Sequence, residues 1–285
     1  MTLLVENIED VRKSVAEARK AGKQIGLVPT MGALHKGHLS LIRRAAADGT
    51  FTVVSIFVNP TQFGTDEDID RYPRPLEADL DVCRTEGVDL VFAPEPGEMF
   101  PGGFCTHVEV EGMGEVMCGA LRPGHFRGVT TVVAKLFDIV QPDVAYFGQK
   151  DAQQGAIIRR MVADLDLPVA ICMLPTVRDA DGLATSSRNA YLAPEDRCRA
   201  LVLSQALKDA ESMLRGGCTN ADKIEQCVRK KVEQTEGVEL QYVAVVDPDT
   251  LEPRQTVGEK VLVALAAMVG KTRLIDNVLL RDLED

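Results

Sequence analysis

The chain has 285 residues, of which 45% are hydrophobic, and its formal net charge is −11. This length suits two domains and a sizeable buried core. The acidic balance, with no block of Lys and Arg, disfavours tight binding to DNA or tRNA. No apolar run approaches the roughly 20 residues of a membrane span. Residues 1–6 also lack the basic segment and long apolar stretch of a secretion signal.

The cysteines indicate a reducing compartment. There are seven of them, an odd number, and none forms a C-x-x-C pair. Reduced thiols in a cytosolic protein are the natural interpretation of this usage. We therefore expect a cytoplasmic protein that binds neither nucleic acid nor membrane.

Through the first 175 residues, short apolar runs alternate with helical patterns. The expected strands are Ile25–Val28, Phe51–Val58, Val88–Ala93, Thr106–Val110, Val144–Phe147 and Val169–Leu174. The expected helices are Ile8–Ala21, Leu39–Ala47, Leu76–Thr85, Val129–Ile139 and Ala152–Leu165. The runs are rich in β-branched residues and do not strictly alternate, which suits strands buried on both faces of a parallel sheet. This pattern predicts an α/β fold with a Rossmann-like doubly wound sheet, whose ligand crevice lies at the carboxyl ends of the strands.

The remainder of the chain has a different pattern. Two amphipathic helices are expected at Pro194–Leu214 and Ala221–Thr235, followed by the β-rich runs Leu240–Val246, Val261–Ala267 and Thr272–Val278. Helices followed by consecutive strands predict a smaller α+β domain with an antiparallel sheet. We expect the first domain to cover residues 1–175 and the second to cover residues 176–285.

The stretch Pro29–His38 directly follows one expected strand and directly precedes an expected helix. A glycine-bearing turn between a strand and a helix aims backbone N–H groups at a bound anion. The helix N-terminus alone contributes only about 0.3–1 kcal/mol, so any catalysis would come from His35 and His38. The alternatives are a metal pair at i, i+3 spacing or two surface histidines. A metal site usually needs further ligands, and the other two histidines, His107 and His125, lie far along the chain.

Two later loops contain a basic residue beside small residues. In Phe147–Asp151, Gly148 permits close backbone approach and Lys150 could meet a phosphate, although an ordinary helix N-terminus would also look like this. In Asp181–Asn189, hydroxyl residues and an arginine suit a lid that closes over a triphosphate. An Asp-Gly turn followed by a serine cap explains the same residues.

Two more loops hold candidate polar contacts. Asn59–Gly64 follows the second expected strand, and Asn59 and Gln62 could hydrogen-bond a small polar substrate or could be turn residues. Leu121–Gly128 contains two arginines and a histidine. Contact with a carboxylate or phosphate and an ordinary salt-bridged loop are both open there.

Five motifs in this order resemble one family. They are P-T-M-G-A-L-H-K-G-H, F-V-N-P-T-Q-F, L-R-P-G-H-F-R-G-V, F-G-Q-K-D-A-Q-Q and D-G-L-A-T-S-S-R-N-A-Y-L. Together they resemble the pantoate–β-alanine ligases (pantothenate synthetases), within the nucleotidyltransferase-like superfamily that carries H-x-G-H. The resemblance runs from about residue 20 to residue 195. It implies an ATP-dependent enzyme that joins pantoate to β-alanine through a pantoyl adenylate and releases AMP and pyrophosphate.

The resemblance also implies roles for individual residues. The catalytic residues would be His38, as proton donor, together with His35, Lys150, Ser186, Ser187 and Arg188. The ATP-binding residues would be Met31, Gly32, Ala33, Leu34, His35, Lys36, Gly37, His38, Gly148, Gln149, Lys150, Asp151, Val177, Thr185, Ser186, Ser187 and Arg188. Gln62 and Gln154 would bind pantoate, with Gln62 also close to the path of β-alanine.

The resemblance further implies Mg²⁺ accompanying the triphosphate through phosphate oxygens and water, so no metal-binding side chain is named. It also implies a homodimer. Two positions depart from the usual family pattern: Thr185 replaces an apolar residue, and Gln149 replaces a lysine or glutamate. We expect both to contact the nucleotide mainly through the backbone. Two other functions stay open, namely another adenylyl transfer to a cofactor precursor on the same scaffold and a non-catalytic nucleotide-binding sensor.

Overall fold

The computed structural model describes residues 2–64 and 68–281, which form two compact units. Among the described residues, the first unit comprises 2–64, 68–115, 119–148 and 157–175. The second comprises residues 116–118, 149–156 and 176–281. This division differs from a single cut after residue 175 in two short segments. They belong to the second unit because Gln153 hydrogen-bonds the backbone of the 116–118 segment and because residues 149–150 bond to Asn277.

The first unit is built on a six-stranded parallel sheet with the order β1-β4-β3-β2-β5-β6. The strands are β1 (Leu3–Val5), β2 (Ile25–Thr30), β3 (Phe51–Ile56), β4 (Leu90–Phe92), β5 (Val144–Gly148) and β6 (Ala170–Leu174). The central strand β2 pairs with β3 on one side and with β5 on the other. The chain changes direction across the sheet between these neighbours, so the switch point lies at the carboxyl ends of β2 and β5. The predicted Rossmann-like sheet is confirmed.

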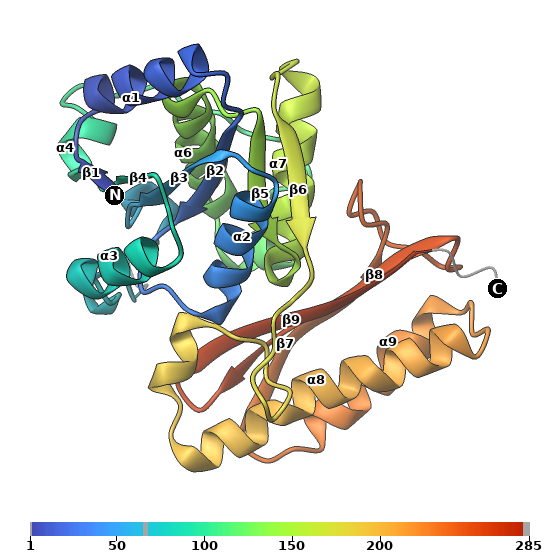
Figure 1. The fold of residues 1–285 in the computed structure, drawn as a ribbon. Helices are drawn as coiled ribbons and strands as arrows, with labels where there is room; N and C mark the ends of the chain where they lie inside the picture. Colours follow the sequence, from blue (N-terminus) through green and yellow to red (C-terminus); the bar gives the residue numbers. More distant parts are fainter. Residues whose placement is uncertain (1, 65–67, 282–285) are drawn as a thin grey trace. The chain divides into compact units, whose positions relative to one another are not determined.

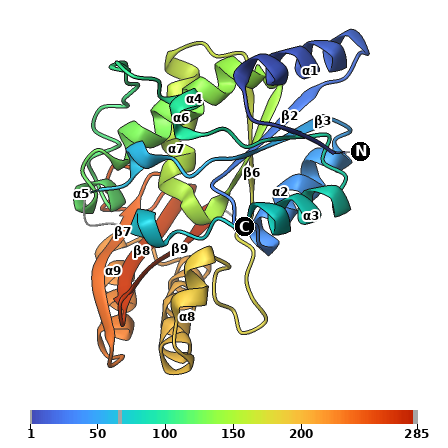
Figure 2. The same cartoon turned by 90° about the vertical axis from the view of Figure 1, so that its left-hand side faces the viewer.

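Helices cover both faces of this sheet (Figures 1 and 2). They are α1 (Ile8–Lys20), α2 (Lys36–Ala47), α3 (Leu76–Thr85), α6 (His125–Val140) and α7 (Ala152–Asp164), with the short α4 (Pro96–Met99), α5 (Cys118–Leu121), η1 (Pro60–Gln62) and η2 (Asp68–Arg71). Successive strand residues face opposite sides of a sheet. Leu27 of β2 accordingly lies in the core formed with α1 and α6, whereas the next residue, Val28, lies in the core formed with α2 and α3.

Two strand assignments in the first unit differ from the sequence prediction. The strand β1, at the edge of the sheet, was not predicted; it pairs in parallel with β4. The predicted strand Thr106–Val110 is wrong, because this segment is an extended loop. Side chains of α6 take the place of a neighbouring strand there: Thr131 Oγ1 accepts from the N–H of Val108, and Thr130 donates to the carbonyl of the same residue. The apolar pattern came from Val108 and Val110, which pack on the core.

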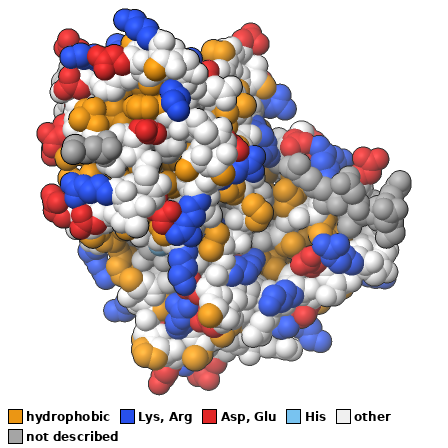
Figure 3. Space-filling model, in the orientation of Figure 1, with side chains coloured by type: hydrophobic (Ala, Val, Ile, Leu, Met, Phe, Trp, Pro, Cys, Tyr) orange, Lys and Arg blue, Asp and Glu red, His pale blue; other side chains and the backbone are white. Residues whose placement is uncertain are grey.

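The second unit contains an antiparallel sheet and two long helices, as predicted. Its elements are η3 (Gln149–Asp151), η4 (Ser187–Tyr191), α8 (Pro194–Arg215), α9 (Ala221–Glu233), β7 (Val238–Val246), β8 (Lys260–Val269) and β9 (Thr272–Arg281). The sheet order is β7-β8-β9, and one face of it packs on the buried sides of α8 and α9. The other sides of these helices carry interspersed acidic and basic residues (Figure 3), including the ion pairs Arg215–Glu211 and Arg229–Glu225.

Two general features bear on the composition arguments. None of the helices in residues 2–64 and 68–281 is long and apolar enough to cross a bilayer. All seven cysteines lie in these ranges, and all are free thiols.

Candidate active site

The loop after β2 turns sharply at Gly32 and Ala33, whose φ angles are +80° and +50°. Such angles are ordinary for glycine and strained for alanine. A Cβ added at Gly32 would lie 2.9 Å from Asp79 Oδ2, so a larger residue would not fit there. Thr30 starts the turn: its hydroxyl accepts from the N–H of Gly32 and donates to the carbonyl of Ser55. The turn therefore has a single well-defined path away from the sheet.

A buried carboxylate holds this turn in place. Asp79, on α3, is 3% exposed and accepts hydrogen bonds from the N–H groups of Ala33 (2.8 Å) and Leu34 (2.7 Å). Burial raises the pKa of Asp79, opposed by those two backbone hydrogen bonds. Sequence reasoning missed this residue, because nothing in the sequence around one aspartate of a helix indicates that its side chain is buried.

His35 and His38 together cap the helix α2. The helix begins at Lys36, earlier than the predicted Leu39, so His35 is its N-cap and His38 lies in its first turn. His35 Nδ1 accepts from the N–H of Gly37 (3.2 Å), and His38 Nδ1 accepts from the N–H of His35 (3.3 Å). The two rings stack with centroids 4.0 Å apart. This is the reciprocal arrangement of a capping box, made with imidazoles.

The capping fixes the tautomer of both rings. Since each Nδ1 accepts a hydrogen bond, the proton of each neutral ring lies on Nε2. Each ring can therefore present an N–H donor beside the helix N-terminus, which itself favours anions. A Cβ at Gly37 would lie 2.9 Å from His35 Cε1, so glycine is required for this ring position. With both Nδ1 atoms engaged, the pair is poorly suited to a metal. Residues 2–64 and 68–281 also hold no cluster of three or more His, Cys, Asp or Glu side chains that could bind one.

The loop after β3 brings Gln62 to the same edge of the sheet. Asn59 is 1% exposed, and its Nδ2 donates to Gln62 Oε1 (3.0 Å) and to the carbonyl of Gly128 (3.1 Å). The amide Nε2 of Gln62 in turn lies 3.1 Å from Met31 Sδ. Gln62 is therefore placed beside the residue that begins the His35–His38 loop, and Asn59 orients its side chain.

Two other residues from the sequence analysis, Arg122 and His125, hold the main chain of Gln62. Arg122 donates to the carbonyl of Gln62 (3.3 Å), and His125 Nδ1 lies 2.8 Å from the same oxygen. Because His125 Nδ1 must donate there, its Nε2 accepts from Arg122 at 3.0 Å. These side chains support a candidate substrate-binding residue.

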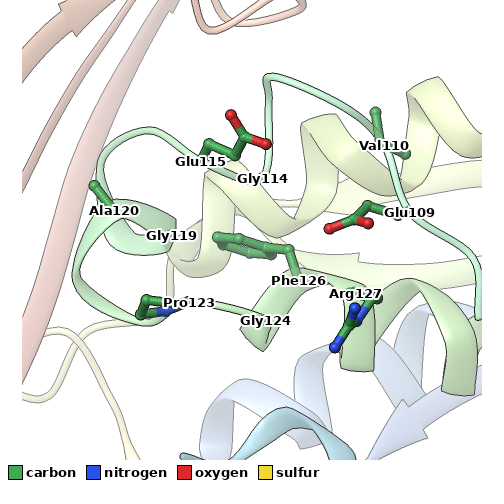
Figure 4. Close-up of a pocket in the computed structure, with 10 residues that line it drawn as sticks. All are labelled: Glu109, Val110, Gly114, Glu115, Gly119, Ala120, Pro123, Gly124, Phe126 and Arg127. Carbon is green, nitrogen blue, oxygen red and sulfur yellow. The ribbon is translucent and has the colours of Figure 1, made fainter.

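A separate cavity of about 320 Å³ lies beside the start of α6 (Figure 4). Its walls come from the 109–115 segment and from the turn before α6, with the ring of Phe126 between them. Glu109, Glu115 and Arg127 are the charged residues of its lining. The lining contains no residue that the sequence analysis assigned to ATP or pantoate.

Phe147 and Gly148 of the FGQKD motif end β5, and its last three residues form the single turn η3 in the second unit. Lys150 is largely buried, and its Nζ lies 3.6 Å from Asp151 Oδ1. Gln149 uses its side chain to donate to Asn277 Oδ1, which is a protein contact not expected from the sequence. Gln154 lies half-buried on the first turn of α7. A Cβ at Gly148, the last residue of β5, would meet no described atom within 4 Å, so the packing of the protein does not itself require glycine there.

The segment leading to Arg188 is a short hairpin followed by a capped turn. Asp181 accepts from the N–H of Leu183, and Gly182 has a φ of +94°, so the Asp-Gly turn is present. Ser186 caps η4 by accepting from the N–H of Arg188. The Asp-Gly turn and the serine cap that the sequence analysis gave as the alternative are therefore both present. Neither conflicts with ligand binding by the same residues.

The two family departures have partners within the protein. Thr185 pairs through its N–H with the carbonyl of Val177, and its hydroxyl donates to Asp179 (2.9 Å). Burial alone would raise the pKa of Asp179, but hydrogen bonds from Arg197 and Thr185 outweigh it and lower that pKa. The hydroxyl of Thr185 therefore stabilises the hairpin. The other departure, Gln149, likewise has a protein partner, because its side chain bonds to Asn277 of β9.

The geometry defines a class of protein. A doubly wound parallel sheet, with an H-x-G-H loop capping the helix that follows its central strand, is the arrangement of a nucleotide-binding α/β protein. A sequence model of one family, described as pantoate-beta-alanine ligase, matches residues 3–279. The chain belongs to the pantoate–β-alanine ligase family. It is an enzyme that forms an amide bond, and it serves the synthesis of pantothenate.

The individual relatives agree with this assignment. The chain is 55% identical to the pantothenate synthetase of Moorella thermoacetica over 277 residues, covering 97% of this chain and 98% of that protein. A solved pantoate–β-alanine ligase structure from Thermus thermophilus is 44% identical, with a TM-score of 0.93 and full coverage of both chains. The enzyme from Francisella tularensis, solved in complex with beta-gamma ATP and beta-alanine, is 34% identical, with a TM-score of 0.80 and 98% coverage of both chains.

Proposed function

We propose that this enzyme makes pantothenate in two steps, with ATP as the activating substrate. In the first step a carboxylate oxygen of (R)-pantoate attacks the α-phosphorus of ATP, giving pantoyl adenylate and pyrophosphate. In the second the amine of β-alanine attacks the acyl carbon; the amide bond forms, the acyl–oxygen bond breaks, and AMP leaves with that bond's electron pair. The amine loses a proton to solvent. No enzyme nucleophile is required, so positioning and charge stabilisation carry the reaction.

The observation that carries this proposal is the paired capping of α2 by His35 and His38. Their fixed tautomer presents Nε2–H donors at a helix N-terminus and at the switch point of the sheet. Such donors suit phosphate oxygens on which negative charge develops as the bond to pyrophosphate breaks. We assign His38 as the proton donor to the leaving phosphate and His35 as its neighbour on the phosphates. Residues Met31–Gly37 line the same ATP site.

The second unit is proposed to contribute the remaining ATP contacts. Lys150 would neutralise charge on the reacting phosphate, and Asp151 would lie toward the ribose. Ser186, Ser187 and Arg188 would bind the triphosphate through hydroxyl and guanidinium groups, which are strong donors to phosphate. The other proposed ATP contacts are Gly148, Gln149, Val177 and Thr185.

Two glutamines are proposed to bind pantoate. An amide side chain can donate to a carboxylate and accept from a hydroxyl, and pantoate carries both groups. Gln62 is supported for this role by the hydrogen bonds that hold its side chain and its main chain. Gln154 lies half-buried on α7. Gln62 would also lie near the path of β-alanine.

Mg²⁺, a dimer and a cytoplasmic location complete the proposal. The described residues offer no three-ligand carboxylate or imidazole cluster, so the metal would bind mainly to phosphate oxygens and water. A homodimer and a cytoplasmic location are proposed from the family and from the seven free thiols.

The test is the pantoate-dependent exchange of labelled pyrophosphate into ATP. The proposal expects exchange with pantoate and without β-alanine, because the first step is reversible and complete in itself. With ATP, pantoate and β-alanine all present, AMP, pyrophosphate and pantothenate should form in equal amounts. No exchange with pantoate would overturn the adenylate route. Exchange with a phosphorylated cofactor precursor instead would indicate a different adenylyl transfer, and ATP binding without any exchange would indicate a sensor.

A further inference from the structure

The strand β9 carries two adjacent polar side chains that are almost fully buried. Asp276 is 3% exposed and Asn277 is 4% exposed. Burying a carboxylate or an amide is costly unless it is hydrogen-bonded. Neighbouring strand residues point to opposite faces, and here each one bonds to a different loop of the second unit. Both loops belong to the proposed ATP site.

Asn277 holds the turn η3. Its Nδ2 donates to the carbonyls of Gln149 (3.0 Å) and Lys150 (2.9 Å), and its Oδ1 accepts from Gln149 Nε2 (3.1 Å). Both N–H groups of the amide therefore donate to main-chain carbonyls of the turn that carries Lys150. Only an amide offers this combination of two donors and one acceptor. The position of the Lys150 backbone is thus set by a residue 127 positions away.

Asp276 holds the hairpin that precedes Ser186. It forms a bidentate pair with Arg178, with distances of 2.6 Å from Nη1 to Oδ2 and 3.1 Å from Nη2 to Oδ1. Arg178 Nη1 also donates to the carbonyl of Gly182, and Arg178 pairs with Ala184 in an antiparallel bridge. The same carboxylate accepts from the N–H of Asn277 (2.8 Å), which joins the two supports.

We infer that Asp276 and Asn277 are positioning residues for the ATP-dependent step. Asn277 acts through Lys150, and Asp276 acts through Arg178 on the segment that carries Ser186, Ser187 and Arg188. This inference rests on the proposed function, which gives those two loops to ATP. Misplacing a reacting group by about 1 Å can cost about 10²-fold in rate, so these contacts set how well Lys150 meets the phosphate.

The main experiment measures pantoate-dependent pyrophosphate exchange in Asn277→Asp and Asn277→Ala. In the aspartate variant, which has nearly the same shape, a carboxylate oxygen faces two carbonyl oxygens. We expect the exchange rate to fall by about 10²-fold in Asn277→Asp and by about tenfold or more in Asn277→Ala. The matched control is Thr272→Val, a buried position of the same strand, which should retain the parent rate and melting temperature. Circular dichroism and thermal melting report whether each variant is folded.

A double-mutant cycle separates positioning from general structural support. If Asn277 acts through Lys150, then Asn277→Ala should cost less than about threefold in a Lys150→Ala background. An equal cost in both backgrounds would overturn the inference, as would folded Asn277 variants that keep the parent rate. A Lys150→Ala enzyme with full exchange would instead refute the proposed ATP role of that loop, and the inference with it.

The second arm tests Asp276 through its partner. Arg178→Lys keeps a positive charge but loses the bidentate geometry, which is specific to arginine. We expect the KM for ATP to rise by about tenfold while the melting temperature stays close to that of the parent. An unchanged KM for ATP in this folded variant would remove Asp276 from the inference. The role of Asn277 would then be tested by the double-mutant cycle with Lys150 alone.

Discussion

Two loops proposed to meet the ATP phosphates are held in place by different means. The His35–His38 end of the loop Met31–His38 supports itself, because the two histidines satisfy backbone N–H groups within three residues of each other. The turn Gln149–Asp151 depends instead on Asn277, a side chain from a strand near the other end of the chain. The first loop is therefore visible as a sequence motif, whereas the support of the second is not. The difference also explains why Gln149 can depart from the family pattern, because its side chain donates a hydrogen bond to Asn277 of β9.

The largest expected effect tests whether the histidines of the first loop do more than cap a helix. His38→Ala should lower pantoate-dependent pyrophosphate exchange by about 10² to 10³-fold with the fold intact, because a preorganised donor is lost. His38→Gln is the matched variant, since glutamine at this position can retain the capping box. It should be nearly as impaired. Because an amide can hydrogen-bond but cannot give up a proton, recovery of the parent rate in His38→Gln would show that His38 is not a proton donor.

The next prediction concerns Asp79, which supports the first loop from another element. In Asp79→Asn, one of the two N–H groups of Ala33 and Leu34 faces an amide nitrogen and loses its acceptor. We expect the KM for ATP to rise by about tenfold. The free energy of unfolding should change less, because the amide avoids the charge burial that raises the pKa of Asp79.

Glu77→Gln, at an exposed position of the same helix, is the control for charge removal. It should leave the KM for ATP unchanged. An Asp79→Asn enzyme with an unaltered KM for ATP would mean that the first loop does not need the charge of Asp79, and would sharpen the contrast between the two loops.

A third prediction compares neighbouring glutamines on α7. Gln154→Ala should weaken pantoate binding by about tenfold, the usual cost of a hydrogen bond to a charged group, and should leave ATP binding unchanged in isothermal titration. Gln153→Ala is the contrast, because Gln153 bonds to the main chain of Val116 and Cys118 and should mainly lower stability. Loss of ATP binding in Gln154→Ala would move that residue from the pantoate site to the nucleotide site.

The smallest expected effect is a pH dependence of the second unit. The lowered pKa of Asp179 means that its ionised form stabilises the fold above its unfolded-state pKa. This stabilisation is lost as the pH falls through the folded-state pKa. Asp179→Asn should therefore be less stable than the parent by about 1 kcal/mol at pH 7. In urea unfolding the difference should shrink below about pH 4; a constant difference would contradict the role of its charge.

Much of the fold could be predicted because its signals are local. Apolar runs and helical periodicity located most strands and helices, and the switch from α/β to α+β patterns located both architectures. The errors have a common cause. Thr106–Val110 has the side-chain pattern of a strand. However, the hydroxyls of Thr130 and Thr131 hydrogen-bond the backbone of this segment at Val108, in place of a neighbouring strand. The edge strand β1 is too short to stand out from three residues alone.

The sequence by itself determined the histidine pair, the glycine between them and the order of the five loops, because each depends on residues close together in the chain. Only the tertiary structure decided what holds those loops: Asp79 for the turn at Ala33, Asn59 for Gln62, and Asn277 with Asp276 for the loops of the second unit. These partners lie on separate elements, apart from Asn59, which is local but could not be told from a turn residue. A buried polar side chain has no spacing rule, since its role depends on which backbone groups folding brings to it.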